Sequence, residues 1–274
     1  MTYFTLTPRH IADFERDGYI IVRNILSEAE TKRLADIAFG DKAMREHAMD
    51  LNDQSGKKTR LTSWYFPGND AYGLLTRSKR LVQAVNKLLD GDSPVCHFHS
   101  KLMQKEPRVG GAWEWHQDYG YWYKNEFLFP DQMISVMIAI TDANKENGCL
   151  QVIRGSHKMG RVEHGFAGEQ VGASQHYVDL ALKTMPLEYV EIKAGDALFF
   201  HSNLIHRSEA NLSDKARWSL ISCYNRQQNV PYNEQSTSST TPLEMVADSA
   251  LMQWQPGIDA GISSFASKEN IHKA

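Results

Sequence analysis

Short stretches rich in β-branched and aromatic residues, each ending at a turn signal, dominate the sequence after residue 94. Turn-forming sequences such as Asn147-Gly148 and Ala194-Gly195-Asp196 separate them. Many short strands at fairly regular spacing are typical of a β-barrel or a β-sandwich. We therefore predict strands at Val95–Lys105, Met133–Thr141, Cys149–Ile153, Tyr189–Ile192, Ala197–His201 and Trp218–Tyr224.

The first third of the chain carries helix signals instead. Thr7-Pro8 is typical of a helix N-cap followed by proline at the first helical position. Ser27 has the properties of a second N-cap, for a helix that runs towards Gly40. Ser78–Leu89 has the apolar spacing of an amphipathic helix. Between these helices, Gly18–Val22 predicts a strand and the polar residues 41–72 predict irregular structure.

These patterns predict a mainly β fold with a helical flank. A chain of 274 residues can bury one large core, so we expect a single domain over residues 1–274. Its helical flank would cover about 1–94, its barrel core about 95–226 and a weakly patterned tail 227–274, which holds the serine and threonine cluster Ser236–Thr241.

Composition and charge narrow the function classes. A formal net charge of −3 leaves no basic surplus to neutralise phosphates, so we expect no nucleic-acid partner. No apolar run reaches the roughly 18 residues of a membrane span, so we expect no membrane association. Three well-separated cysteines without CxxC spacing argue against a disulfide framework or a Cys-rich zinc site. They favour a reducing compartment, for which the cytoplasm is the default.

His116-Gln117-Asp118 is the first candidate for a metal site. In an extended segment, His116 and Asp118 point to the same face, so both can reach one ion. His206 is a candidate third ligand, and its competitors are His157, His164, His176 and His201. Two imidazoles and one carboxylate on one face leave positions open for O2 and a bidentate cosubstrate at Fe(II). Taken alone, the HxD pair is equally well explained as a solvent-exposed or capping pair.

Three further segments accompany this pair. Trp115-His116-Gln117-Asp118-Tyr119 is followed by Glu146-Asn147-Gly148-Cys149-Leu150 with Gly155-Ser156-His157, and then by His206-Arg207-Ser208 and Arg217. In this order and spacing, residues 10 to 226 resemble the phytanoyl-CoA dioxygenase family, although Arg154 stands where the family often has proline. Trp122 and Tyr224-Asn225-Arg226 add a resemblance to its branch of free-amino-acid and ectoine hydroxylases.

The resemblance implies a double-stranded β-helix, that is, a jelly-roll or cupin-like core. It also implies Fe(II) at His116, Asp118 and His206, with 2-oxoglutarate as cosubstrate, O2 as oxidant and ascorbate as a supporting reductant. For the distal carboxylate of 2-oxoglutarate it indicates Arg217 and Ser208. It indicates Gln117, Lys101 and Met137 as further cosubstrate contacts. The ordinary alternatives are a strand-edge surface position for Arg217 and an outward-pointing Lys101.

Aromatic residues crowd positions 113–123 around the metal pair. Packing at a barrel mouth explains many of them, but those that point with His116 and Asp118 would line the substrate cavity. Aromatic faces stabilise ammonium groups, which favours a small cationic or zwitterionic substrate. We therefore expect substrate contacts at Trp122, Tyr119 and Asn225. The long segment 160–184 is either a lid that is mobile without ligand or an ordinary surface excursion.

The expected activity is hydroxylation of a C–H bond in a small molecule, because a carboxylate at position 118 occupies the site that related halogenating enzymes leave open for halide. Acyl-CoA thioesters and natural-product scaffolds are alternative substrates within the same family. Two other classes remain open. One is a metal-binding barrel without oxidative activity, and the other is a zinc or manganese hydrolase or isomerase, for which no nucleophile motif such as GxSxG is present. The sequence leaves the oligomeric state open.

Overall fold

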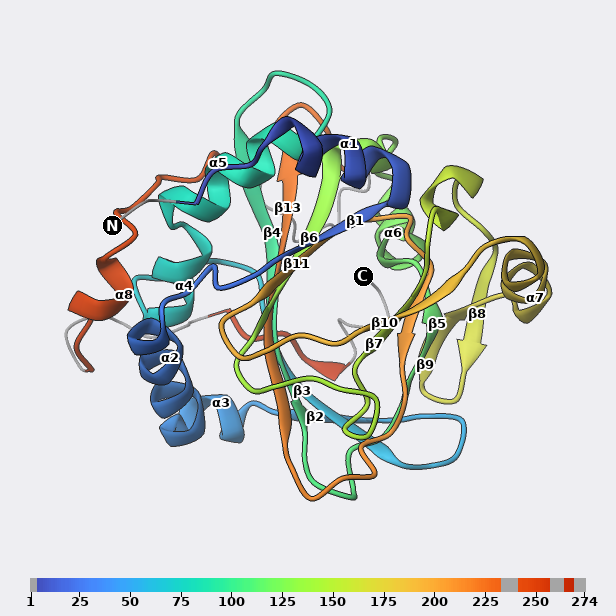
Figure 1. Cartoon of the computed structure of the whole chain (residues 1–274), viewed down its shortest axis with the longest axis horizontal. Helices are drawn as coiled ribbons and strands as arrows, with labels where there is room; N and C mark the ends of the chain where they lie inside the picture. The colour runs from blue at the N-terminus through green and yellow to red at the C-terminus, as the bar shows by residue number, and fades with distance from the viewer. Residues whose placement is uncertain (1–3, 233–240, 257–263, 269–274) are drawn as a thin grey trace.

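Two antiparallel β-sheets face each other across the interior of the protein (Figure 1). The computed structural model describes residues 4–232, 241–256 and 264–268, so only Thr241 of the cluster Ser236–Thr241 lies within it. In the described residues, the larger sheet has seven strands in the order β1-β11-β6-β13-β4-β3-β2, and the smaller has four in the order β10-β7-β12-β5. This arrangement is the jelly-roll core that the sequence predicts.

The strands of the large sheet are β1 (Tyr19–Val22), β2 (Met49–Asn52), β3 (Lys58–Trp64), β4 (Val95–Lys105), β6 (Met133–Ala139), β11 (Ala197–His201) and β13 (Arg217–Arg226). Those of the small sheet are β5 (Trp113–His116), β7 (Leu150–Ile153), β10 (Leu187–Val190) and β12 (His206–Ser208). All six predicted strands of the barrel are present, and only their ends differ by a few residues. The short strands β5 and β12, which carry ligands, were too brief to stand out in the sequence.

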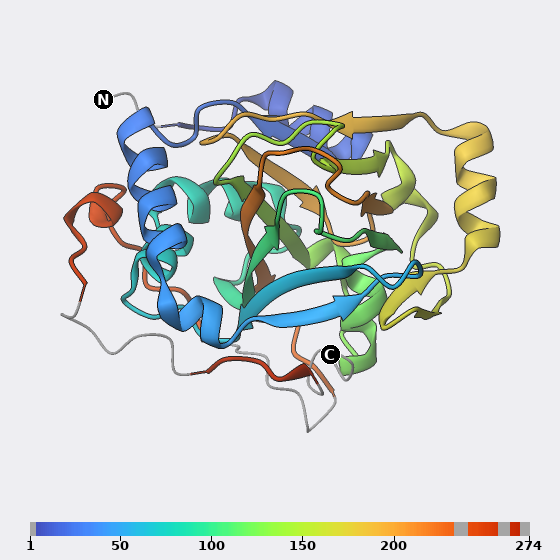
Figure 2. The ribbon, with the colours of Figure 1, turned by 90° about the horizontal axis from the view of Figure 1, so that it is seen from below.

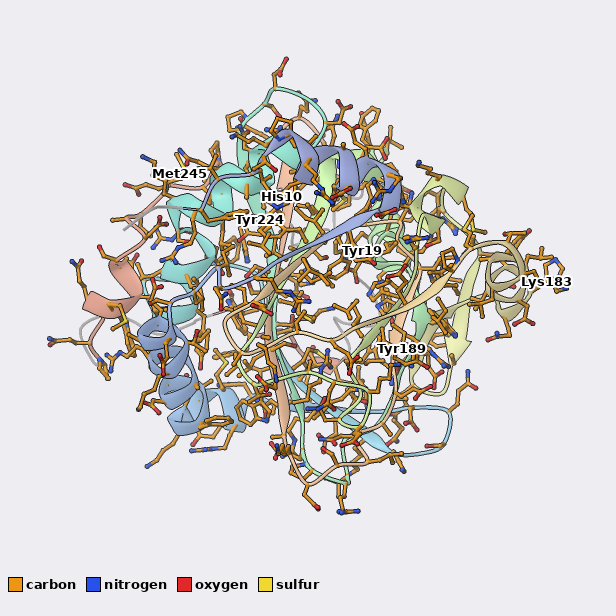
Figure 3. The ribbon with its side chains drawn as sticks, viewed as in Figure 1. His10, Tyr19, Lys183, Tyr189, Tyr224 and Met245 are labelled. Carbon is orange, nitrogen blue, oxygen red and sulfur yellow. The ribbon has the colours of Figure 1, made fainter. Side chains whose placement is uncertain are left out.

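Helices cover the outer face of the large sheet (Figures 1 and 2). Thr7 and Ser27 form the predicted caps, each in a reciprocal capping box with the residue three positions on. The large core cluster lies between these helices and the sheet. Tyr224 of β13 belongs to it and donates its hydroxyl to the carbonyl of Thr76 at 2.8 Å (Figure 3).

The helices of the described residues, including those that lie away from this face, are α1 (Pro8–Asp17), α2 (Glu28–Gly40), α3 (Lys42–Glu46), α4 (Ala71–Thr76), α5 (Lys79–Leu88), α6 (Asp118–Trp122), α7 (Gln175–Thr184) and α8 (Ala250–Gln253), with 3-10 turns at Tyr123–Asn125, Pro130–Gln132 and Ser156–Met159.

The prediction that residues 41–72 are irregular is wrong. They form α3, β2, β3 and the start of α4, and β3 pairs with β4 from Arg60 to Trp64. The alternation of this strand was hidden because one of its buried residues is the polar Thr59, between the exposed Lys58 and Arg60. Since β1, β2 and β3 all join the large sheet, the boundary predicted near residue 94 does not separate a helical flank from the barrel.

The segment 160–184 is regular secondary structure. It forms a hairpin of β8 (His164–Ala167) and β9 (Gln170–Ala173), followed by α7. The helix lies at the outer edge of the molecule, where Lys183 projects away from the protein (Figure 3). The hairpin is attached to the core, because the hydroxyl of Tyr121 donates to the carbonyl of Val171 at 2.6 Å. Its role as a lid stays a prediction.

The described part of the C-terminal tail returns to the large sheet beside β3. The amide of Ala266 donates to the carbonyl of Ser63 at 2.8 Å, and the amide of Tyr65 donates to the carbonyl of Ser264 at 3.3 Å. Lys268 forms an ion pair with Glu169 at the tip of the β8–β9 hairpin. Across the described ranges, no helix combines the length and apolar character that crossing a membrane requires.

Candidate metal centre

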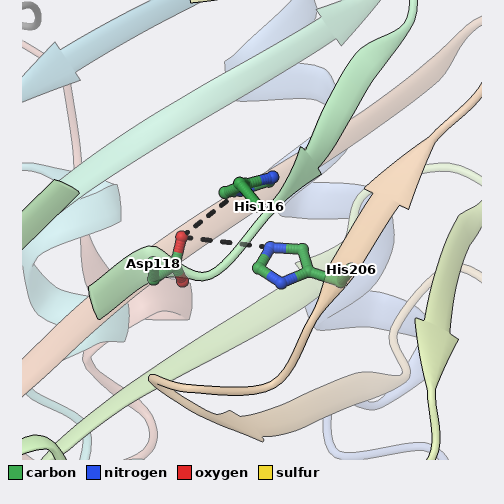
Figure 4. Close-up of side chains that lie close together, drawn as sticks. All are labelled: His116, Asp118 and His206. Carbon is green, nitrogen blue, oxygen red and sulfur yellow. Dashed lines mark ion pairs between the residues drawn. The ribbon is translucent and has the colours of Figure 1, made fainter. Parts of the chain in front are cut away.

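His116, Asp118 and His206 meet between the two sheets (Figure 4). His116 ends β5, Asp118 is the first residue of α6, and His206 begins β12 directly opposite His116 in the antiparallel pair. The Oδ1 atom of Asp118 lies 3.6 Å from Nε2 of His116 and 3.9 Å from Nε2 of His206. All three side chains are buried. Gln117 keeps an extended backbone, so the predicted alternation holds for this turn although the strand itself ends at His116.

Both imidazole rings are oriented by their own strands. Nδ1 of His116 is 2.8 Å from the carbonyl of Glu114, and Nδ1 of His206 is 2.8 Å from the carbonyl of Leu204. A carbonyl only accepts, so each Nδ1 carries the hydrogen and each Nε2 presents a lone pair to the centre. On both strands, the ring therefore contacts the carbonyl of the residue two positions earlier, and this contact orients Nε2 for metal binding.

The charges also suit a metal ion. Burial opposes ionisation of Asp118, but the charge of Lys101 holds the pKa of this carboxyl well below its usual value. Burial, followed by repulsion from His116, lowers the pKa of His206 to about 3. At neutral pH the carboxylate is therefore charged and the His206 ring neutral, the states that ligation requires. Two imidazole nitrogens and one carboxylate fit Fe(II) with open positions for oxygen chemistry.

The competing histidines lie elsewhere. His201 contacts Oδ1 of Asp131 at 3.0 Å, His157 contacts the carbonyl of Glu15, and His176 is exposed on α7. His164 accepts a hydrogen bond from the amide of Gln117 at 3.0 Å. Within the described residues, only His116, Asp118 and His206 bring three potential metal-binding side chains together.

A cavity with about 390 Å³ of empty space, partly open to solvent, lies next to His116 and His206. Four of the predicted cosubstrate residues line it. Lys101 comes from β4, Met137 from β6, Ser208 from β12 and Arg217 from β13. Lys101, Trp113 and His116 line both this cavity and a second one.

Arg217 is a buried cation that meets no carboxylate among the described residues. Its side chain makes one weak contact, from Nη2 to the sulfur of Met137 at 3.6 Å, and its Nε has no partner within the described residues. Burial lowers the pKa of the guanidinium to about 10. A buried charge is costly unless it is paired, so this position is suited to an anion that enters the cavity.

Gln117 does not face the cosubstrate cavity, contrary to the prediction. Both hydrogens of its side-chain amide are used, one by the carbonyl of Gly160 at 2.8 Å and one by that of Asn203 at 2.7 Å. Its side-chain oxygen accepts from the amide of Val162 at 2.8 Å. Because it alternates with the two ligands, Gln117 points to the opposite side and joins the two segments that precede β8 and β12.

The second cavity has about 550 Å³ of empty space, partly open to solvent, next to His116 and Asp118. Trp122 lines it as predicted, but Tyr119 does not and instead donates its hydroxyl to the carbonyl of Phe127. The reason is that a helix begins at Asp118, so residues three and four positions later share its face. The wall is made by Leu61, Ser63, Tyr65, His99, Lys101, Trp113, Tyr121 and Trp122.

Asn225 is not at the cavity mouth either. It is buried and exchanges hydrogen bonds with Asn229, through Nδ2 to the backbone carbonyl at 2.7 Å and through Oδ1 to the side chain at 2.9 Å. The adjacent Arg226 donates to the carbonyls of Asn86, Leu89 and Asp90 at the end of α5. Both residues therefore hold the end of β13 rather than contact a ligand.

Several cavity residues were missed. His99 is one of them, and it lies two positions before the predicted Lys101 on β4, so strand alternation already indicated that the two share a face. Tyr121 was accessible from helical spacing once α6 was known to begin at Asp118. By contrast, Ser63 and Tyr65 come from a segment that was predicted to be irregular, and no local pattern marked them as part of the site.

A jelly-roll barrel that holds two histidines and one aspartate at a buried cavity defines a mononuclear non-haem metal oxygenase. The chain belongs to the phytanoyl-CoA dioxygenase (PhyH) family, whose sequence profile matches residues 14–219. The resemblance, the fold class and the assignment as a dioxygenase are thereby confirmed.

The curated proteins that this chain resembles include a proline hydroxylase, ectoine dioxygenases and phytanoyl-CoA dioxygenases. L-proline trans-4-hydroxylase of Streptomyces griseoviridis is 28% identical over 233 residues, which cover 80% of this chain and 86% of that protein. Ectoine dioxygenase of Nocardia farcinica is 24% identical over 238 residues, with coverage of 80% and 78%. The solved structure of EctD from S. alaskensis with 2-oxoglutarate and 5-hydroxyectoine superposes with a TM-score of 0.70 at 20% identity and covers 88% of both chains.

Proposed function

We propose that this dioxygenase hydroxylates a C–H bond of a small cationic or zwitterionic metabolite. Iron(II) and 2-oxoglutarate are its cofactors. The observation that carries the proposal is the pair of cavities that meet at His116 and share Lys101. One is suited to the dicarboxylate and the other to the molecule that is oxidised.

The cavity that Arg217 and Ser208 line, called the deep cavity below, supplies the contacts for 2-oxoglutarate. Arg217 pairs with the distal carboxylate through its guanidinium, and the hydroxyl of Ser208 adds a donor from the facing sheet. Lys101 makes no ion pair within the described residues, and its Nζ lies 5.8 Å from the centre of the Trp113 ring, so its charge is available at the junction of the cavities. Bound iron supplies the activation of O2, coupled to conversion of 2-oxoglutarate to succinate and CO2.

The second cavity, next to His116 and Asp118, is called the outer cavity below, and its wall sets the character of the substrate. Four aromatic side chains, Tyr65, Trp113, Tyr121 and Trp122, supply ring faces and edges, which favour an ammonium group packed against a compact apolar body. The acyl-CoA and natural-product alternatives require a larger part of the substrate to lie outside this wall.

A substrate panel tests the proposal. The protein is supplied with Fe(II), ascorbate and 2-oxoglutarate, and succinate and a product 16 mass units heavier are measured for amino acids, cyclic zwitterions, betaines and acyl-CoA thioesters. We expect substrate-dependent succinate with the small charged compounds and none with a His206→Ala control. Turnover of acyl-CoA alone would replace the substrate class. Fe(II) binding without succinate for any compound would favour the non-oxidative metal-binding barrel.

The three cysteines, Cys96, Cys149 and Cys223, are free and buried. This supports our proposal that the protein works in a reducing compartment, the cytoplasm. Fractionation of the cells that produce it, followed by immunodetection, is the direct measurement.

A further inference from the structure

The second oxygen of the Asp118 carboxylate is held by a residue on the opposite sheet. Oγ of Ser135 donates to Oδ2 of Asp118 at 2.5 Å, while Oδ1 faces the two imidazoles. Ser135 lies in the middle of β6, and its Oγ is 3.3 Å from the sulfur of Cys223 on β13. The two strands place these residues opposite each other, and both are completely buried.

The direction of this hydrogen-bond chain follows from its chemistry. An ionised carboxylate only accepts, so the single hydroxyl hydrogen of Ser135 goes to Asp118. Ser135 can then only accept from Cys223, whose thiol is the donor. Burial, and next the charge of Asp118, raise the pKa of Cys223 to about 12, so the thiol keeps its hydrogen at neutral pH.

We infer that Ser135 is a positioning residue that holds Asp118 in place to bind iron through Oδ1 alone, with Cys223 orienting the serine hydroxyl. This inference rests on the proposed function. A carboxylate with one oxygen fixed by a short hydrogen bond cannot readily rotate to offer both oxygens. The coordination position that the second oxygen would occupy is thereby kept for O2 or the cosubstrate.

The hydrogen bond from Ser135 to Asp118 has a further structural consequence. Asp118 begins a helix of one turn, Asp118–Trp122, which has no side-chain cap of its own. The bond to Ser135 fixes this turn to the large sheet, whereas His116 and His206 belong to the small one. Without the serine hydroxyl, Oδ2 is left buried without a donor, and the carboxylate can satisfy it by turning towards the metal.

The test is Fe(II) affinity, measured anaerobically by calorimetry for the full chain and for Ser135→Ala, Ser135→Thr and Cys223→Ala. We expect Ser135→Ala to raise the Fe(II) Kd about 10- to 100-fold, the range for removal of an outer partner of a metal ligand. Ser135→Thr keeps the hydroxyl and should restore most of the affinity. Cys223→Ala keeps the direct bond and should weaken binding by only about fivefold or less.

A matched control separates positioning from general stability. Ser222 is a buried serine on β13 that bonds to the hydroxyls of Thr76 and Ser100 on the other side of the large sheet, away from the metal ligands. Ser222→Ala should change thermal unfolding in EDTA about as much as Ser135→Ala but leave the Fe(II) Kd unchanged. The visible charge-transfer band of the anaerobic complex with Fe(II) and 2-oxoglutarate should change in Ser135→Ala and not in the control.

The outcomes are distinguishable. If the unaltered protein binds no Fe(II), the proposed function itself fails. If it binds Fe(II) and Ser135→Ala binds equally well with the same charge-transfer band, only the role of Ser135 is refuted. If Ser135→Ala does not fold, Ser135→Cys takes its place, because a thiol of similar size is a much weaker hydrogen-bond donor than the hydroxyl. An Fe(II) Kd and a charge-transfer band equal to those of the unaltered protein would then refute the role of Ser135.

Discussion

Arg217 offers a test in which stability and cosubstrate binding move in opposite directions. Its guanidinium is 3% exposed and pairs with no carboxylate in the part of the chain that the structure describes, so its buried charge is uncompensated there. The fall of its pKa from 12.5 to about 10 corresponds to roughly 3 kcal/mol against the charged form. Arg217→Met keeps an unbranched side chain of similar length but removes this charge.

We expect Arg217→Met to stabilise the protein without ligand. A gain of about 3 kcal/mol corresponds to a rise in Tm of at least about 5 °C for a chain of this size. The same substitution should raise the KM for 2-oxoglutarate by at least about 30-fold, because loss of one partner of a desolvated charge pair costs about 2 kcal/mol or more. Arg217→Lys keeps the charge but loses the bidentate geometry, so it should weaken binding without the gain in Tm.

Two measurements test the expected changes in Tm and in the KM for 2-oxoglutarate. Thermal unfolding is followed in EDTA without 2-oxoglutarate, and the KM comes from succinate formation at saturating Fe(II). A KM within threefold of that of the unaltered protein would place the carboxylate anchor elsewhere. A fall in Tm for Arg217→Met would mean that the guanidinium makes stabilising contacts that outweigh its burial.

Three further predictions concern the metal centre. His206→Ala should lose bound iron and His201→Ala should retain it, as measured by iron content after anaerobic loading; the reverse result would reassign the third ligand. Fe(II) at 100 times its Kd should stabilise the protein by about 2.7 kcal/mol, and EDTA should remove this gain in a thermal-unfolding assay, unless the ion binds the unfolded chain equally well. Gln117→Leu should cost at least about 2 kcal/mol in urea unfolding, because it leaves three backbone groups unpaired, while the KM for 2-oxoglutarate of the iron-loaded enzyme stays constant. A selective rise in that KM would restore the original prediction for Gln117.

The metal ligands could be predicted because the physics that places two of them is local. Alternation across one residue brings His116 and Asp118 to one side, and this holds whether or not the strand continues. The same rule also sends Gln117 to the opposite side, so its assignment to the cosubstrate was in conflict with the argument for its neighbours. His206 could not be chosen by local pattern. It needed the register between β5 and β12, which sets it directly opposite His116.

The substrate wall was harder to predict because the periodicity changes within the motif. Up to Gln117 the side chains alternate, and from Asp118 onwards they follow a helical repeat. Tyr119 therefore turns into the core while Tyr121 and Trp122 line the cavity. Asn225 was misassigned for a different reason, since its amide is used by Asn229 in a local turn that the strand pattern does not reveal.

The strand-like contact of residues 264–266 with Ser63 and Tyr65 has a practical consequence. These two residues line the outer cavity, which is the proposed substrate site, so residues 264–266 support one wall of this cavity through backbone hydrogen bonds. Removal of residues 264–268 would take away the hydrogen bonds to the backbone of Ser63 and Tyr65, although none of these residues is a metal ligand. Substrate preference is therefore expected to change in a variant that is shortened before residue 264.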